Sequence, residues 1–173
     1  MNEKIDFVVT WVDGADKVWY QKKQEYQQIV NPSKKLNSAS RYRDYEIFKY
    51  WFRAVEVYAP WVNNIFLITD NQIPSWLDTT NPKLTCVSHT DYIDQQFLPT
   101  FNSNVIELSI ANIKKLSEHF VLFNDDIFLN APVEPTDFFI NGLPRETYAE
   151  SPIVSTEGSG AHIMVNDMQI INT

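Results

Sequence analysis

The chain has 173 residues, of which 44% are hydrophobic and 14% aromatic, so general disorder is excluded and one domain can bury a continuous core. The formal net charge is −8, which makes nucleic acid an unsuitable partner. The N-terminus does not resemble a signal peptide, no apolar run approaches the roughly 20 residues of a membrane span, and the single cysteine, Cys86, forms no internal disulfide. We therefore expect a soluble cytoplasmic protein, with peripheral contact at the inner face of the membrane left open.

The first predicted unit is a buried strand over residues 5–12, a turn at residues 13–16 and a helix over residues 17–29. Gly14 is free to take a positive φ in the turn, and Asp16 can cap the helix. A helix start after a strand offers free amides and the positive end of the helix dipole, which favours an anionic ligand. One glycine falls short of a dinucleotide fingerprint, so this signal is weak.

The longest helical pattern covers residues 41–58, with apolar side chains at three- and four-residue spacing. Arg41, Arg43 and Asp44 gather in its first turn. They are either a charged turn on a solvated helix or phosphate contacts, because a guanidinium group binds two oxygens at once.

Three further apolar strands are predicted over residues 64–69, 84–88 and 120–123, and each runs into a polar cluster. Because parallel strands place their carboxyl ends on one edge of a sheet, we expect these clusters to converge there. The pattern predicts an α/β fold with a mostly parallel sheet and helices on both faces. The clusters are residues 70–72, 89–91 and 124–126.

Asp125 and Asp126 directly follow the last of these strands. Adjacent carboxylates beside buried backbone repel each other and lose hydration, so they need a compensating cation. Mg²⁺ (or Mn²⁺) suits this position, held by one or two carboxylates and by the oxygens of a phosphorylated substrate. The alternative interpretation is an acidic turn exposed to solvent.

The remaining patterns are less specific. A polar elbow over residues 98–104 leads into a helix capped by Asn102 or Ser103, and capping explains both residues without any ligand. Residues 137–143 predict a hairpin around an Asn-Gly turn. His89 follows a strand and is a candidate acid or base, and the three histidines have no zinc-ligand spacing.

Several of these segments resemble the Stealth family of capsular-polysaccharide phosphotransferases, which is similar to the catalytic region of N-acetylglucosamine-1-phosphotransferase. The opening run over residues 6–14, with Asp16 and Trp19, resembles the family's first conserved region. The second region is similar over residues 41–44, 58–61, 69–76, 89–91, 98–107 and 123–126. The resemblance covers most of residues 5–130.

The resemblance implies a Rossmann-like sheet of the nucleotide-sugar transferase type. It also implies transfer of a hexose-1-phosphate, commonly N-acetylglucosamine 1-phosphate, from a UDP-sugar to a hydroxyl of a polysaccharide or lipid-linked glycan, with release of UMP. Asp125 and Asp126 would hold Mg²⁺. The implied substrate contacts are Trp11, Val12, Asp13, Gly14, Asp16, Arg41, Arg43, Asp44, Asn71, Gln72, Asn102 and Ser103.

Family members continue into a third and a fourth conserved region, and this sequence resembles only the approach to the third, at residues 166–172. The resemblance thus predicts a single α/β domain over residues 1–173 that is the N-terminal portion of a longer catalytic domain, or that a second polypeptide completes. Two other functions stay open: a glycosyltransferase that releases UDP, and a non-catalytic module that binds a sugar nucleotide.

Overall fold

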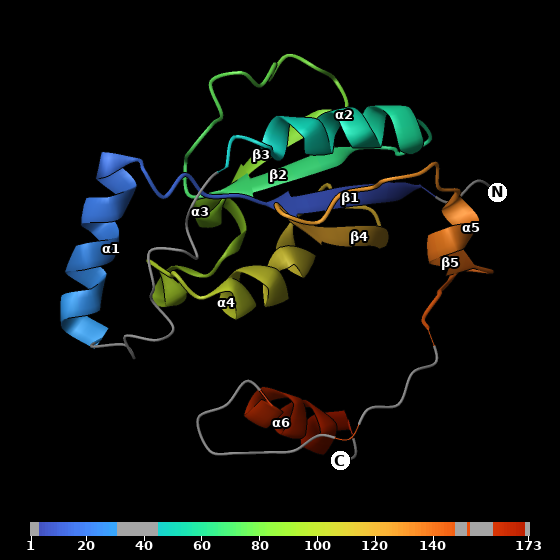
Figure 1. Ribbon diagram of the computed structural model, residues 1–173. Coiled ribbons are helices and arrows are strands. Elements are labelled where there is room, and N and C mark those ends of the chain that lie inside the picture. The colour runs from blue at the N-terminus through green and yellow to red at the C-terminus, as the bar shows by residue number, and fades with distance from the viewer. Residues whose placement is uncertain (1–3, 31–44, 148–151, 153–160, 172–173) are drawn as a thin grey trace.

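The computed structural model describes residues 4–30, 45–147, 152 and 161–171. At its centre is a four-stranded sheet in the order β3-β2-β1-β4 (Figure 1). Every neighbouring pair is parallel, which confirms the predicted α/β sheet. The strands are β1 (Ile5–Thr10), β2 (Ile65–Thr69), β3 (Leu84–Ser88) and β4 (His119–Asn124).

Helices cover both faces of the sheet. Helix α2 (Phe48–Tyr58) lies on one face, and the short helices on the other include α3 and α4 (Figure 1). Each face has its own apolar core, because alternate residues of β1 point to opposite sides: Phe7 and Val9 pack toward α2, and Val8 packs toward the short helices. The short elements are α3 (His89–Tyr92), η3 (Gln95–Phe97), α4 (Ser103–Leu108) and η4 (Ile110–Asn112).

Aromatic side chains fix α2 against the sheet. Trp51 and Phe7 are fully buried, and the ring centroid of Phe123 on β4 lies 5.5 Å from that of Trp51 and 4.8 Å from that of Phe7. Contacts of this kind add about 0.5–1.5 kcal/mol each beyond the area that they bury. They hold β4 against β1, so the carboxyl ends of these two strands lie side by side.

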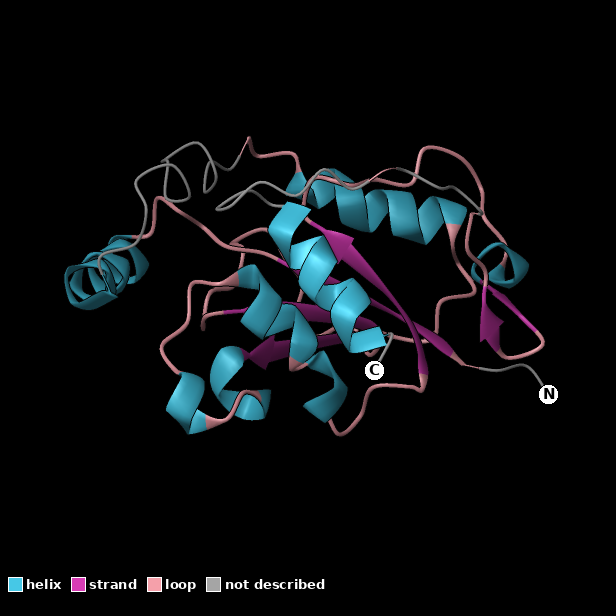
Figure 2. Ribbon diagram, turned by 90° about the horizontal axis from the view of Figure 1, so that it is seen from below, coloured by secondary structure: helices cyan, strands magenta, loops and turns pink. Residues whose placement is uncertain are grey.

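The predicted hairpin is also confirmed, and it forms a separate two-stranded sheet beside short helix α5 (Figure 2). Asn141 and Gly142 have φ angles of 54° and 77°, as a two-residue hairpin turn requires. No helix in the described part of the chain is long and apolar enough to cross a membrane. The other elements are α1 (Lys17–Val30), α5 (Pro135–Phe138), β5 (Phe139–Ile140), β6 (Leu143–Pro144) and α6 (Ala161–Ile171).

Some predicted boundaries are wrong. Helix α2 begins at Phe48 rather than at residue 41, and Glu46, with φ 58°, has a left-handed backbone that a helix does not admit. The first strand ends at Thr10, before the predicted Val12. The elbow leads into two short helical pieces, α4 and η4, rather than one helix.

A buried carboxylate supports the amino end of the sheet. Asp6 is fully buried, and its oxygens accept hydrogen bonds from Asn63 Nδ2 at 2.7 Å, from the Asn64 amide at 3.0 Å and from the Ser117 amide at 2.7 Å. These contacts join the connections that lead into β2 and β4. The carboxylate therefore fixes where both strands begin.

We expect Asp6→Ala to lower the free energy of unfolding by about 3 kcal/mol, because it leaves three partly buried donors without an acceptor. Urea unfolding measures this loss. Asp78→Ala is the matched control, since that carboxylate accepts from Thr80 on the exposed surface. Equal losses in the two variants would contradict the structural role of Asp6.

Candidate functional site

The carboxyl ends of the four strands lie on one edge of the sheet, and a pocket of about 190 Å³ opens there. The strand order changes direction between β1 and β4, and open α/β sheets bind ligands beyond such a switch point. All four strand ends contribute to the wall, together with α1 and the start of α4. The lining residues are Thr10, Trp11, Val12, Trp19, Ile68, Asp70, His89, Thr100, Phe101, Ser103, Ile106 and Asp125.

Trp11 forms the wall at the end of β1. Its ring stacks on Phe48, the first residue of α2, with centroids 5.8 Å apart and planes 5° from parallel. It is 9% exposed, so it contributes to the core and to the pocket at once. Trp19 on α1 lies edge-on to Phe101 at 5.6 Å, which closes the wall between α1 and the loop before α4.

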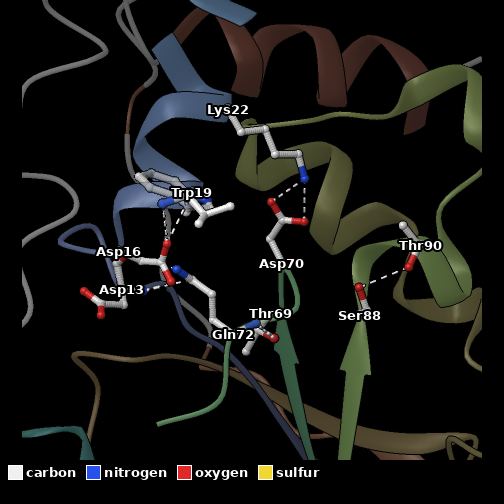
Figure 3. Close-up of polar contacts among 10 residues, drawn as sticks. Asp13, Asp16, Trp19, Lys22, Thr69, Asp70, Gln72, Ser88 and Thr90 are labelled. Atoms are coloured by element: carbon white, nitrogen blue, oxygen red, sulfur yellow. Dashed lines mark hydrogen bonds and ion pairs between the residues drawn. The ribbon is translucent and has the colours of Figure 1, made fainter. Parts of the chain in front are cut away.

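The turn after β1 is held by its own side chains (Figure 3). Asp16 caps α1 by accepting from the amides of Val18 and Trp19 at 2.8 and 2.9 Å. The bond from the Trp19 amide is the largest of several effects that lower the pKa of Asp16. Its charge therefore persists at neutral pH and complements the helix dipole. The predicted cap at Asp16 is confirmed.

Gln72 braces this turn from the neighbouring strand. Its Oε1 accepts from the Asp13 amide and its Nε2 donates to the Asp13 carbonyl, both at 3.0 Å, while its own amide donates to Thr69 Oγ1 at 3.1 Å (Figure 3). Both ends of the amide are thus engaged with protein. Gln72 does not line the pocket, and it acts on the site by fixing the turn between β1 and α1.

At the end of β4 the two aspartates have different surroundings. Asp125 is half-buried and lines the pocket, whereas Asp126 is exposed and does not. Their adjacency at the switch point offers carboxylate oxygens of the kind that Mg²⁺ prefers. Among the described residues, no three acidic, histidine or cysteine side chains gather in a metal-binding group.

His89 faces the pocket from the first residue of α3. It is 8% exposed, and burial, the largest effect, lowers the pKa of its imidazole. The Asp70 carboxylate raises that pKa and the Lys22 ammonium group lowers it. The net direction is downward from 6.5, so the ring is neutral at physiological pH and ready to accept a proton.

Lys22 and Asp70 form an ion pair next to this histidine. Lys22 Nζ lies 2.8 and 2.6 Å from the two Asp70 oxygens, and Figure 3 shows the ammonium group pointing at the carboxylate. The Asp70 side chain is 7% exposed and that of Lys22 41% exposed. The pair joins α1 to the end of β2 and lies in the same wall as His89.

The structure brings five of the predicted site residues together around the pocket: Trp11, Val12, His89, Ser103 and Asp125. The other predicted site residues that the structure describes do not line it: Asp13, Gly14, Asp16, Asn71, Gln72, Asn102 and Asp126. Asn102 accepts from the Asn104 amide at 3.0 Å as the cap of α4. Arg41, Arg43 and Asp44 lie outside the described residues.

Sequence reasoning placed Asp70 in a polar cluster at the sheet edge without naming it a site residue, and it missed Lys22 and Thr100. Asp70 carries the same signal as Asp125, a carboxylate directly after a buried strand, and that signal could have found it. Lys22 lies on a helix among other lysines and glutamines, where nothing in the sequence separates it from its neighbours. Only the fold brings it to the strand ends.

A parallel sheet with helices on both faces and a pocket at its switch point is characteristic of Rossmann-like α/β proteins. Comparison with models of known protein families identifies the family within this class. Residues 41–146 match conserved region 2 of the Stealth proteins, and residues 3–29 match conserved region 1. The chain belongs to the Stealth protein family.

Curated relatives match almost the whole chain. It is 54% identical over 170 residues to the capsular polysaccharide phosphotransferase WcwK of Streptococcus pneumoniae, covering 98% of this chain and 51% of the relative. It is 54% identical over 172 residues to the receptor polysaccharide phosphotransferase WefC of Streptococcus oralis, covering 98% and 52%. The exopolysaccharide phosphotransferase cps2G of Lactiplantibacillus plantarum is 51% identical over 169 residues, covering 97% and 49%. The chain spans about half the length of these relatives.

Proposed function

We propose that the chain carries the donor-binding half of a phosphotransferase that moves a hexose-1-phosphate, foremost N-acetylglucosamine 1-phosphate, from a UDP-sugar to a hydroxyl of a surface polysaccharide, with release of UMP. The observation that carries the proposal is the pocket at the β1–β4 switch point, where Asp125 meets the end of β1. The relatives named as polysaccharide phosphotransferases supply the reaction class.

The residues fit a bound Mg²⁺. Asp125 lines the pocket and Asp126 follows it in the chain, so their carboxylates would hold the ion and the substrate's phosphates would complete the ligand set. The chemistry that Mg²⁺ supplies when bound is neutralisation of the diphosphate and of the departing UMP. Asp125 would be the ligand inside the pocket, and Asp126 would support it from the exposed side.

The chain's own residues then bind and align the reactants. Trp11 and Val12 hold the nucleotide at the end of β1, in a turn that Gln72 and Asp16 keep in place. The acceptor's O–H bond breaks with its proton passing to neutral His89, its oxygen bonds to the phosphorus that carries the sugar, and the P–O bond to UMP breaks. The products are a phosphodiester and UMP. Alignment of this kind supplies much of the rate of phosphoryl transfer.

The test is the nucleotide released from UDP-N-acetylglucosamine with Mg²⁺ and an acceptor glycan, separated by chromatography. UMP supports the phosphotransferase. UDP instead identifies a glycosyltransferase, which breaks the bond between the sugar and the diphosphate.

A second candidate function is a module that binds the sugar nucleotide without turnover. It predicts that UDP-N-acetylglucosamine with Mg²⁺ raises the melting temperature while neither UMP nor UDP appears. Asp125→Ala would abolish that stabilisation.

A further inference from the structure

A second hollow, of about 530 Å³, opens beside the pocket at the strand ends. The two cavities share three wall residues, Asp70, His89 and Thr100. His89 and its neighbouring carboxylate therefore stand between two cavities rather than at the end of one. A group in either cavity can reach the imidazole.

The lining of the second hollow differs from that of the pocket. Thr90 and Gln95 are exposed polar residues, and beside them Ile93, Leu98 and Pro99 contribute apolar surface. Hydrogen-bonding groups next to apolar surface suit a sugar ring, which presents hydroxyls at its rim and C–H groups on its faces. This lining fits a glycan.

The charges that line the second hollow also favour a glycan. Its lining holds one ammonium group, Lys22, and one carboxylate, Asp70, and these two neutralise each other at 2.6 Å. The described lining therefore offers a diphosphate no uncommitted positive charge. A neutral ligand is favoured there, whereas the charged donor would bind on the Asp125 side, where a cation could be held.

We propose that this second hollow is the acceptor subsite, where a neutral sugar unit of the growing polysaccharide presents its hydroxyl to His89. This inference depends on the proposed function, since it assigns the second substrate of that reaction. The donor's phosphorus lies on the Asp125 side of His89, and the acceptor enters from the Gln95 side. Separate entrances let the attacking oxygen approach along a line that the leaving UMP does not occupy.

The test fills the hollow without touching the pocket. Gln95→Trp places a large ring on an exposed position that lines only the second hollow, and Gln96→Trp places the same ring on the neighbouring exposed residue, which lines neither cavity. Gln95→Ala, which adds no bulk, is the second variant. The protein in its natural length is assayed for UMP release, with water or with an oligosaccharide from the producing cell's own surface polysaccharide as acceptor.

We expect Gln95→Trp to raise the KM for the oligosaccharide about tenfold and Gln95→Ala about threefold, while the KM for the UDP-sugar and UMP release to water stay unchanged. Gln96→Trp is expected to match the wild type. Wild-type turnover with unchanged oligosaccharide KM in both Gln95 variants overturns the subsite alone, as does a rise in the donor KM. A wild-type protein that releases no UMP overturns the proposed function with it.

Discussion

Replacing Asp125 with asparagine is expected to lower UMP release from UDP-N-acetylglucosamine about a thousandfold. The side chain keeps its size and loses its charge at the position where the diphosphate's cation would lie. A bound metal ion stabilises a phosphoryl-transfer transition state by several kcal/mol, and each 1.4 kcal/mol corresponds to about tenfold in rate. Steady-state kinetics over a range of Mg²⁺ concentrations measure the loss.

Two further variants make this expectation specific. Asp126→Asn removes an exposed carboxylate that does not line the pocket, so we expect a smaller loss that high Mg²⁺ concentrations partly restore. Glu118→Gln makes the same charge change on an exposed residue just before β4, at the opposite end of that strand. It is expected to leave activity unchanged. An Asp125→Asn enzyme with wild-type turnover and Mg²⁺ dependence would refute the assignment.

The polar residues at the strand ends explain why the site could be predicted in outline. Apolar runs without alternation indicate strands buried on both faces, and parallel strands necessarily end at the same edge. That reasoning predicted that His89 and Asp125 would lie at one edge, and both line the pocket, whereas Trp11 was predicted only from the family resemblance. It needed only the order of apolar strands and polar residues along the chain, which can be seen in short stretches of sequence.

Side-chain pairings across the fold could not be predicted in this way. Gln72 was expected to contact the substrate, yet both ends of its amide bond to Asp13 in another connection, 59 positions away. Lys22 reaches Asp70 across 48 positions. Such contacts depend on how α1 is oriented relative to β2, and no local sequence pattern predicts that orientation.

The start of α2 shows a related limit. The predicted stripe of apolar side chains begins next to the true helix start, but the predicted start at residue 41 lies seven residues before Phe48. Glu46, at φ 58°, keeps the helix from starting earlier, and no glycine or proline in the sequence marks this position. The stacking of Phe48 on Trp11 then sets the first turn, and this contact again joins distant parts of the chain.

His89→Gln is expected to reduce turnover about a hundredfold, with little change in the KM for the UDP-sugar. Proton transfer by a positioned side chain contributes about 10²–10⁴-fold, and glutamine keeps the polarity while removing the base. Added imidazole should restore part of the activity of His89→Ala, because the free base can enter the space that the ring leaves. A loss that appears only in the donor KM would instead indicate a binding role.

The pH dependence of turnover distinguishes a base at His89 from one elsewhere. Because burial lowers the pKa of the imidazole, the acid limb of the wild-type profile should lie below pH 6.5. Asp70→Asn removes the charge that raises this pKa and leaves the Lys22 ammonium group unpaired, so the limb should move to lower pH. Lys22→Met removes a charge that lowers the pKa and leaves the Asp70 carboxylate unpaired, so the limb should move to higher pH. Opposite shifts from the two halves of one ion pair require a titrating group beside both, and equal or absent shifts would place the base elsewhere.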